Sequence, residues 1–198
     1  MIMGNFLSSC DPKEKDGKNN KSIEIKNNSE EIEQVEDGRI GKKLAPFNPS
    51  HKEVIDIALH FLEPSPGAII YDLGCGDGRF LVEAARRFDI KGIGIEYDQK
   101  YFSRAVENVK GAHLDAKVQI IHGNILDQEF THAKLIFLYL VPEGIRMIRD
   151  KLIWCLRKNP SCRIVTYVFS IPDLIPVKSD VYKSTSIRLY TKDSLNPS

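Results

Sequence analysis

The sequence has few cysteines and none with the spacing of a metal site or a disulfide framework. Its four cysteines, Cys10, Cys75, Cys155 and Cys162, form no C-x-x-C pair, and its five histidines are scattered. This pattern predicts neither a structural zinc site nor a set of disulfides, so we expect no bound metal. Sparse, unpaired cysteines are typical of reducing compartments, which favours a cytoplasmic location.

The chain also lacks a surplus of charge and a long hydrophobic run. Its 28 Lys and Arg against 27 Asp and Glu leave a formal net charge of +1, with a pI near 7.7. No basic cluster is interleaved with aromatic residues, so we expect no nucleic-acid partner. The apolar run at 135–141 is far shorter than the roughly 20 residues of a membrane span.

What the sequence does contain is enough apolar material for one domain. Hydrophobic residues make up 42% of the 198 residues, which suffices for a core. Residues 11–40, in contrast, are rich in Lys, Glu, Asp, Asn and Ser, and such a segment cannot offset the entropy lost on ordering. We therefore predict a disordered polar tail at 1–43 and a folded domain at 44–198.

The first ten residues carry a lipidation pattern. Residues 3–8, MGNFLS, match the N-myristoylation pattern with Gly4 as acceptor, and Cys10 offers a palmitoylation site. Two acyl chains anchor a protein stably, whereas one is marginal. Because the acceptor glycine must be N-terminal, this hypothesis of membrane anchoring requires initiation at Met3 or a processing step. The alternative is an unmodified flexible terminus.

Strand-like and helix-like segments alternate through the domain. A first helix is predicted to start at a capping box of Ser50 and Glu53 and to end before Pro64. Near-continuous apolar strands that alternate with amphipathic helices indicate a parallel sheet covered on both faces. Two short C-terminal strands are expected to close it in antiparallel fashion. The prediction is a Rossmann-like α/β fold with a mostly parallel, seven-stranded sheet: strands at 68–73, 92–96, 118–122, 135–140, 163–169, 180–183 and 186–191, and further helices at 79–87, 99–112 and 145–156.

A glycine-rich turn, YDLGCGDGRF at 71–80, joins the first strand to the second helix. Glycines let the backbone approach a ligand, and a helix N-terminus offers unpaired N–H groups. Arg79 stands where a dinucleotide motif needs its third glycine, and Asp72 suits a cationic group better than a phosphate. The turn resembles that of class I methyltransferases, whose cofactor S-adenosylmethionine (SAM) carries an ammonium and a sulfonium but no phosphate.

This resemblance assigns cofactor-binding roles around the turn. Asp72 is expected to bind the methionine ammonium, directly or through water, with a turn cap as the alternative role. Gly74 and Gly76 bring the backbone close to the amino-acid part of SAM. Cys75 enters the site as a small residue of the turn, and Asp77 either contacts the ligand or caps the helix.

The nucleoside part of SAM is expected at the next two strands. Glu96 ends the second strand about 20 residues beyond the turn, where a carboxylate can accept both ribose hydroxyls. Tyr97 packs on the adenine or belongs to a partly exposed core. Asn124 is placed to bind the adenine amino group, with an ordinary Asx turn as the alternative. Ile125 is expected to cover the ring.

The end of the fourth strand narrows the class of methyltransferase. It reads FLYLVP at 137–142, without the N/D-P-P-Y tetrapeptide common in amino-methyltransferases of bases or glutamine. Over about residues 44–192 the chain resembles the small lysine N-methyltransferases of the adenine nucleotide translocase and the ATP synthase c subunit. The motifs that carry this resemblance are PFNPS at 46–50, YDLGCGDGR at 71–79, LYLVP at 138–142, VFSIP at 168–172 and LY at 189–190.

The resemblance implies a SAM-dependent protein-lysine N-methyltransferase. Its expected partner is a protein substrate that carries the acceptor lysine, and membrane proteins are among the candidates. We expect Tyr139 to hold the acceptor amine through its hydroxyl, with a strand-end core tyrosine as the alternative role. Phe47, where the family commonly has Tyr, is expected to form a lid over the cofactor.

The resemblance also implies a mitochondrial location, beside the cytoplasmic or acyl-anchored one. The hydrophobic N-terminal segment of the mitochondrial members is replaced here by the polar tail. Two alternative functions remain at this point: methylation of RNA or a small molecule, and a SAM-fold protein that binds partners without catalysis.

Overall fold

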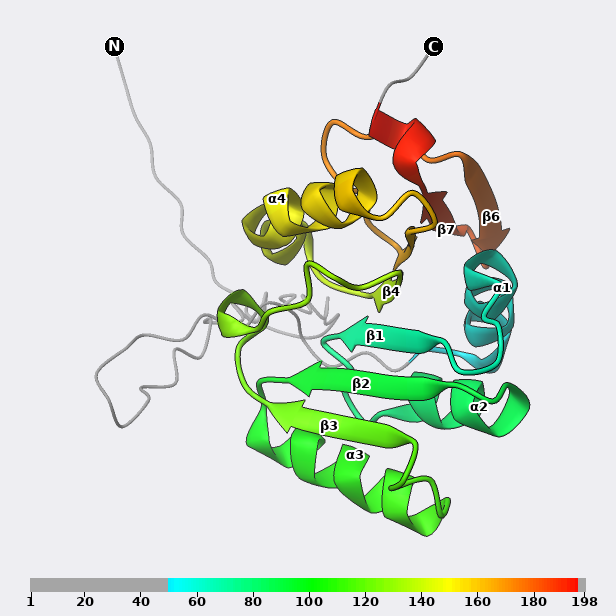
Figure 1. Ribbon diagram of the computed structural model, residues 1–198, viewed down its shortest axis with the longest axis vertical. Helices are drawn as coiled ribbons and strands as arrows, with labels where there is room; N and C mark the ends of the chain where they lie inside the picture. The colour runs from blue at the N-terminus through cyan, green and yellow to red at the C-terminus, as the bar shows by residue number, and fades with distance from the viewer. Residues whose placement is uncertain (1–49, 196–198) are drawn as a thin grey trace, which may run out of the picture. The chain divides into compact units, whose positions relative to one another are not determined.

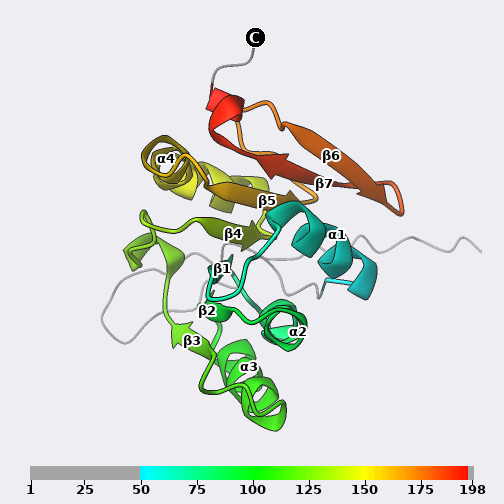
Figure 2. The ribbon, with the colours of Figure 1, turned by 45° about the vertical axis from the view of Figure 1, so that its right-hand side comes forward.

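Seven strands form one mixed sheet in the computed structural model, which describes residues 50–195. Their order is β3-β2-β1-β4-β5-β7-β6, from bottom to top in Figure 2. The first five strands pair in parallel, and β7 is antiparallel to both β5 and β6. The predicted Rossmann-like α/β fold is thus confirmed. The strands are β1 (Ile69–Leu73), β2 (Lys91–Glu96), β3 (Val118–His122), β4 (Leu135–Leu138), β5 (Arg163–Tyr167), β6 (Lys178–Tyr182) and β7 (Thr185–Tyr190).

Helices cover both faces of this sheet. The helices α1 (Lys52–Leu62), α2 (Arg79–Arg87) and α3 (Gln99–Gly111) lie on one face, and α4 (Pro142–Lys158) lies on the other (Figures 1 and 2). One core cluster joins α1 and α2 to the sheet, and a second joins α4 to its opposite face. Two short 3-10 turns, η1 (Ile125–Asp127) and η2 (Lys192–Leu195), complete the described elements. Between residues 50 and 195, none of the helices has the length and apolar character needed to cross a membrane.

Some predicted boundaries were wrong. The N-cap of α1 is His51, without a side-chain cap, so Ser50 lies outside the helix and forms no capping box with Glu53. Helix α4 begins at Pro142, one turn before the predicted start, because proline favours the first helical position. Strand β4 accordingly ends at Leu138. The predicted lid residue Phe47, the acylation sites Gly4 and Cys10, and the domain boundary at 43/44 lie outside the described residues.

The strand order fixes where a ligand can bind. The chain runs outward from β1 through β2 to β3 and then crosses back to β4 on the other side of β1. In open α/β sheets the ligand crevice lies at such a switch point, beyond the carboxyl ends of the strands. The glycine turn after β1 and the residues after β2 and β4 therefore share one edge of the sheet.

Candidate cofactor site

The turn after β1 has a shape that glycine makes accessible. Gly74 has a φ of 82°, and the N–H groups of Gly74 and Cys75 both donate to the carbonyl oxygen of Ile95, at 2.9 and 3.0 Å. A Cβ atom on Gly74 would lie 2.8 Å from Cδ2 of Leu140, the second residue after β4. A side chain at position 74 would therefore face both an unfavourable backbone conformation and a collision.

Glu96, at the end of β2, fastens this turn. Its Oε2 accepts a hydrogen bond from the Gly76 N–H at 2.8 Å, and its Oε1 accepts one from the Asp98 N–H at 2.9 Å. Each carboxylate oxygen has a further lone pair, so Glu96 can hold the turn and still accept hydroxyl groups from a ligand. The sequence suggested the second task and gave no sign of the first.

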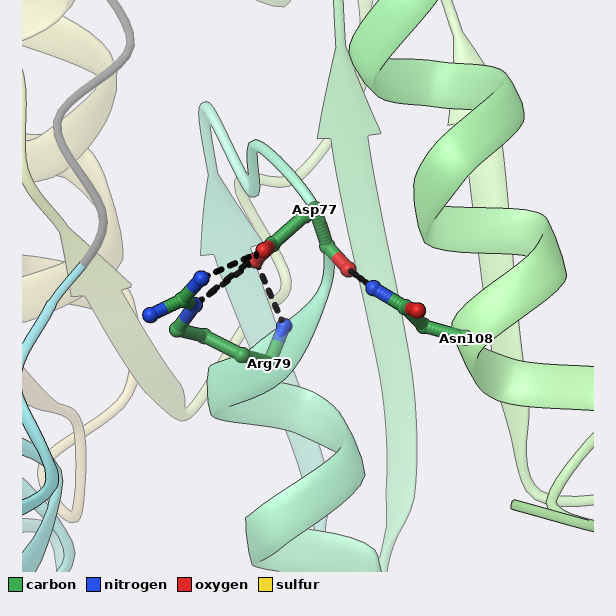
Figure 3. Close-up of polar contacts among 3 residues, drawn as sticks. All are labelled: Asp77, Arg79 and Asn108. Carbon is green, nitrogen blue, oxygen red and sulfur yellow. Dashed lines mark hydrogen bonds and ion pairs between the residues drawn. The ribbon is translucent and has the colours of Figure 1, made fainter. Parts of the chain in front are cut away.

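Asp77 forms an ion pair with Arg79, and its carboxylate also accepts from the first N–H of α2, although the N-cap position itself is the next residue. Its carboxylate lies 2.6 Å from Nη2 of Arg79 and also accepts from the Arg79 backbone N–H at 3.3 Å (Figure 3). The N-cap itself is Gly78, in the left-handed region. From α3, the Asn108 amide donates to the Asp77 carbonyl oxygen at 2.9 Å. Asn108 and Arg79 are thus supporting residues that no local sequence signal indicated.

The electrostatics of the site favour a cationic ligand. Asp72 is only 3% exposed, and its burial, together with repulsion from Glu96 and Asp77, raises its pKa well above the ordinary value. Burial likewise raises the pKa of Glu96, against the hydrogen bonds that stabilise its ionised form. Burial also disfavours the charged form of Asp77, but hydrogen bonding to Arg79 outweighs it and lowers that pKa. A cation placed among these carboxylates would stabilise their ionised forms.

Cys75 acts as a packing residue. Its side chain is buried, and a Cβ atom on Gly94 of β2 would lie 2.7 Å from the Cys75 Sγ. Burial, and then the nearby Asp72, raises the pKa of the Cys75 thiol well above its usual range. The thiol is therefore neutral and unreactive, in keeping with the expectation that it is merely small.

The residues expected at the adenine end gather beside β2 and β3. Asn124 accepts a hydrogen bond from the Leu126 N–H at 3.0 Å, which is the Asx turn named as its alternative role; its Oδ1 keeps a second lone pair. Ile125 is buried, and its Cδ1 lies 4.0 Å from the position of a Cβ on Gly74. Tyr97 is half-buried, and its carbonyl oxygen accepts from Nε2 of His122 at 3.0 Å. The roles of all three toward adenine stay predictions.

Tyr139, expected to hold the acceptor, follows β4 directly. Its ring is half-buried and meets the ring of Tyr167 edge-on, with 4.7 Å between the ring centroids. The described part of the chain holds no group of three or more His, Cys, Asp or Glu residues arranged for a metal ion. The three cysteines within residues 50–195 are free.

The arrangement fits SAM. A buried carboxylate can meet its ammonium, close backbone its amino-acid part, and the carboxylate of Glu96 its ribose hydroxyls. The fold also matches an RNA methyltransferase from Salinibacter ruber solved with S-adenosyl-L-homocysteine, with a TM-score of 0.68 and 28% identity over 73% of this chain and 93% of that one. The sheet order, the turn and this match define a class I SAM-dependent methyltransferase.

The family within that class is shown by a match over half the chain. The family described as "ANTKMT methyltransferase domain" matches residues 72–178, and this protein belongs to it. A protein-lysine N-methyltransferase from Saccharolobus islandicus is 29% identical over 127 residues, which cover 64% of this chain and 78% of the relative. A carboxy-S-adenosyl-L-methionine synthase from Wolinella succinogenes is 31% identical, over 60% of this chain and half of its own length. The resemblance stated from the motifs is therefore confirmed at the level of the family.

Proposed function

We propose that this protein transfers a methyl group from SAM to the ε-amine of a lysine in a protein substrate. The observation that carries the proposal is the likeness to the Saccharolobus protein-lysine N-methyltransferase, which spans 78% of that relative. Membership of the ANTKMT family, whose match includes the turn, Glu96 and Tyr139, supports it. Bound SAM supplies an activated methyl group, so the protein need not activate that group further.

The task left to the protein is to present a neutral amine. The ε-amine of lysine ordinarily titrates near ~10.4, so it must lose a proton before its lone pair can attack. As the new N–C bond forms, the C–S bond breaks and its electron pair remains on sulfur. Burial in a dry site favours the neutral amine, and positioning it in line with the methyl group supplies much of the rate. Tyr139 is our candidate for holding the nitrogen.

The proposal is tested by supplying labelled SAM and the purified protein to a lysate of the source cell, followed by mass spectrometry of the labelled species. Label on a lysine ε-amine supports the proposal and identifies the substrate. An Asp72→Asn protein serves as the matched control, because background transferases in the lysate remain active in its presence. Absence of lysine label above that control contradicts the proposal.

A second function, RNA methylation, is favoured by one observation: the Salinibacter protein with the similar fold is named an RNA methyltransferase. Against it, the net charge of +1 gives no general attraction to a polyanion. The same labelled lysate separates the two functions. Label that nuclease removes and protease leaves would assign the protein to RNA.

Location and anchoring belong to the same proposal. We infer a cytoplasmic enzyme that reaches membrane-bound substrates through acylation of Gly4 and Cys10; the family resemblance makes a mitochondrial location the alternative. The support is the MGNFLS pattern with its nearby cysteine. Mass spectrometry of protein purified from the source cell provides the test, since an unmodified or internal Gly4 would remove the anchor.

A further inference from the structure

Three tyrosines, one directly after β4 and one at the end of each of β5 and β6, lie at the carboxyl edge of the sheet. We call Tyr139, Tyr167 and Tyr182 the tyrosine cluster. Tyr139 and Tyr167 meet edge to face, 4.7 Å between centroids with an interplanar angle of 61°. Tyr182, at the end of β6, packs with Tyr139 against the core cluster that contains Tyr167. Only Tyr139 had been singled out from the sequence.

The cluster lies on the same face of the sheet as Asp72. Asp72 pairs with Phe137 of β4, and Tyr139 follows two residues later, so both side chains point to that face. Tyr167 of β5 and Ile187 of β7 are paired and belong to one core cluster with Phe137. The cluster is therefore the next group of side chains along this face from the cofactor carboxylates, on the side away from β2.

A lysine amine of the protein itself lies beside the tyrosine cluster. Nζ of Lys183 lies 5.2 Å from the centroid of the Tyr182 ring, within the range of a cation–π contact. Interaction with Tyr182, and to a smaller extent with the Glu53 carboxylate, raises the pKa of the Lys183 amine. An ammonium is thus favoured beside the Tyr182 ring.

The backbone that carries the cluster is held in a costly conformation at one residue. Val168, directly after Tyr167, has a φ of 71°, which is a genuine outlier for a β-branched residue. Lys183 and Ser184, directly after Tyr182, have φ of 45° and 65°, as the two loop residues of a tight hairpin commonly do, so the costly conformation is that of Val168. Hydrogen bonds hold Val168 in place: its N–H donates to Ser186 and its carbonyl accepts from Arg188. Strain of this kind gathers at functional sites, where the surrounding structure enforces it.

We propose that Tyr167 and Tyr182, with Tyr139, form the pocket that receives the acceptor lysine, binding its ammonium and its methylated forms through the ring faces. The inference rests on the proposed function, because it names the part of the site that would recognise that substrate. A methylated ammonium donates fewer hydrogen bonds but keeps its charge and gains apolar surface. An aromatic pocket therefore retains the amine as methyl groups are added.

The test measures binding of two probes to the full-length protein loaded with S-adenosyl-L-homocysteine, by NMR titration. One probe is Nα-acetyl-Nε-trimethyl-lysine amide, and the other is its neutral analogue with carbon in place of the charged nitrogen. We expect the cationic probe to bind more tightly. Tyr182→Leu and Tyr167→Leu should each weaken it by between about 2-fold and about 30-fold, the range of cation–π contacts.

Controls separate recognition from folding. Tyr167 is buried, so Tyr167→Leu is checked by thermal melting, and Tyr182→Leu, at a half-buried position, keeps the test valid if that variant unfolds. Tyr182→Phe keeps the ring and should retain most of the affinity. Trp154→Leu is the matched control, because Trp154 also carries a lysine, Lys158 at 4.7 Å, but lies on α4 across the sheet. It should leave binding unchanged.

Equal affinity for the two probes, no binding of either, or an equal loss in Trp154→Leu would each overturn the tyrosine pocket. These results are independent of the labelling experiment. Lysine label without binding that depends on the cluster rejects the pocket and leaves the proposed function intact. Cluster-dependent binding without any lysine label rejects lysine as the acceptor instead.

Discussion

Replacing Asp72 by asparagine should stabilise the unliganded protein while it weakens cofactor binding. Asp72 is almost completely buried and faces two further carboxylates, so its charged form is disfavoured in the fold. When the pKa of a carboxyl is higher in the folded than in the unfolded protein, the fold is most stable at a pH below the unfolded pKa. That stability is lost as the pH rises through the folded pKa. The wild-type protein therefore loses stability as the pH rises above the ordinary range of the carboxyl, whereas the neutral amide of Asp72→Asn has nothing to lose.

The direction of the effect follows from the raised pKa of Asp72. Each pKa unit corresponds to about 1.4 kcal/mol of differential stability, and 1 kcal/mol moves the Tm of a domain of this size by about 2–4 °C. We therefore expect Asp72→Asn to raise the Tm measurably at pH 8. The gain should shrink as the pH falls toward ~4, the ordinary range of the carboxyl. SAM affinity should fall at least about 10-fold, since a hydrogen bond to a charged group contributes about 1.5–3 kcal/mol.

Calorimetry of melting between pH 4 and pH 8, with and without SAM, measures both effects. Asp89→Asn is the matched control, because Asp89 is an exposed carboxyl whose pKa is lowered by its hydrogen bond to Lys117. That change should not raise the Tm and should leave SAM affinity intact. A lower Tm for unliganded Asp72→Asn at pH 8, together with undiminished SAM binding, would refute the electrostatic reasoning.

Three further predictions concern the same edge of the sheet. Glu96→Ala should weaken SAM binding at least about 10-fold, measured by titration calorimetry. The reason is that the substitution removes the carboxylate that would accept the ribose hydroxyls and that accepts the Gly76 N–H of the glycine turn. Unchanged affinity would exclude the ribose role. Gly94→Ala should cost about 1–3 kcal/mol by denaturant unfolding, because its Cβ meets the Cys75 Sγ at 2.7 Å. Adding Cys75→Ala should recover part of that loss, and simple additivity of the two changes would count against this contact. The SAM affinity of the wild-type protein should fall as the pH drops through the raised pKa of Asp72, and binding should release protons. Calorimetry in buffers of different ionisation enthalpy detects the release, and no dependence on buffer would be the contrary result.

Periodic elements could be read from the sequence, and irregular ones could not. Helix α2 and strand β3 have the predicted bounds, because apolar period and flanking glycine or polar residues mark both ends. The β6–β7 hairpin was placed but its turn was not, since Lys183 and Ser184 adopt left-handed conformations without the Asn-Gly signal. The conformation of this turn is therefore set by tertiary contacts of the hairpin and not by the sequence of the turn itself.

The candidate site divides in the same way. The residues at strand ends, such as Asp72 and Glu96, follow from a motif that places them next to a turn. The bond from Glu96 to the Gly76 N–H and the brace from Asn108 to Asp77 join segments separated by 20 and 31 positions. Neither has a local signature, because each depends on how two elements meet in space. Tyr167 and Tyr182 were missed for the same reason.

The two roles of Glu96, in holding the turn and in facing the ribose, affect any attempt to change the cofactor specificity of this protein. One carboxylate both faces the expected ribose position and fastens the turn that would receive the amino-acid end, so a change made to admit an altered sugar also loosens the opposite end of the pocket. Selectivity for modified SAM analogues would therefore be sought first in substitutions at Tyr97 and Asn124. Those side chains are expected beside the nucleoside, and the hydrogen bonds described above fasten the glycine turn to Ile95 and Glu96 rather than to them, so each can be varied in turn.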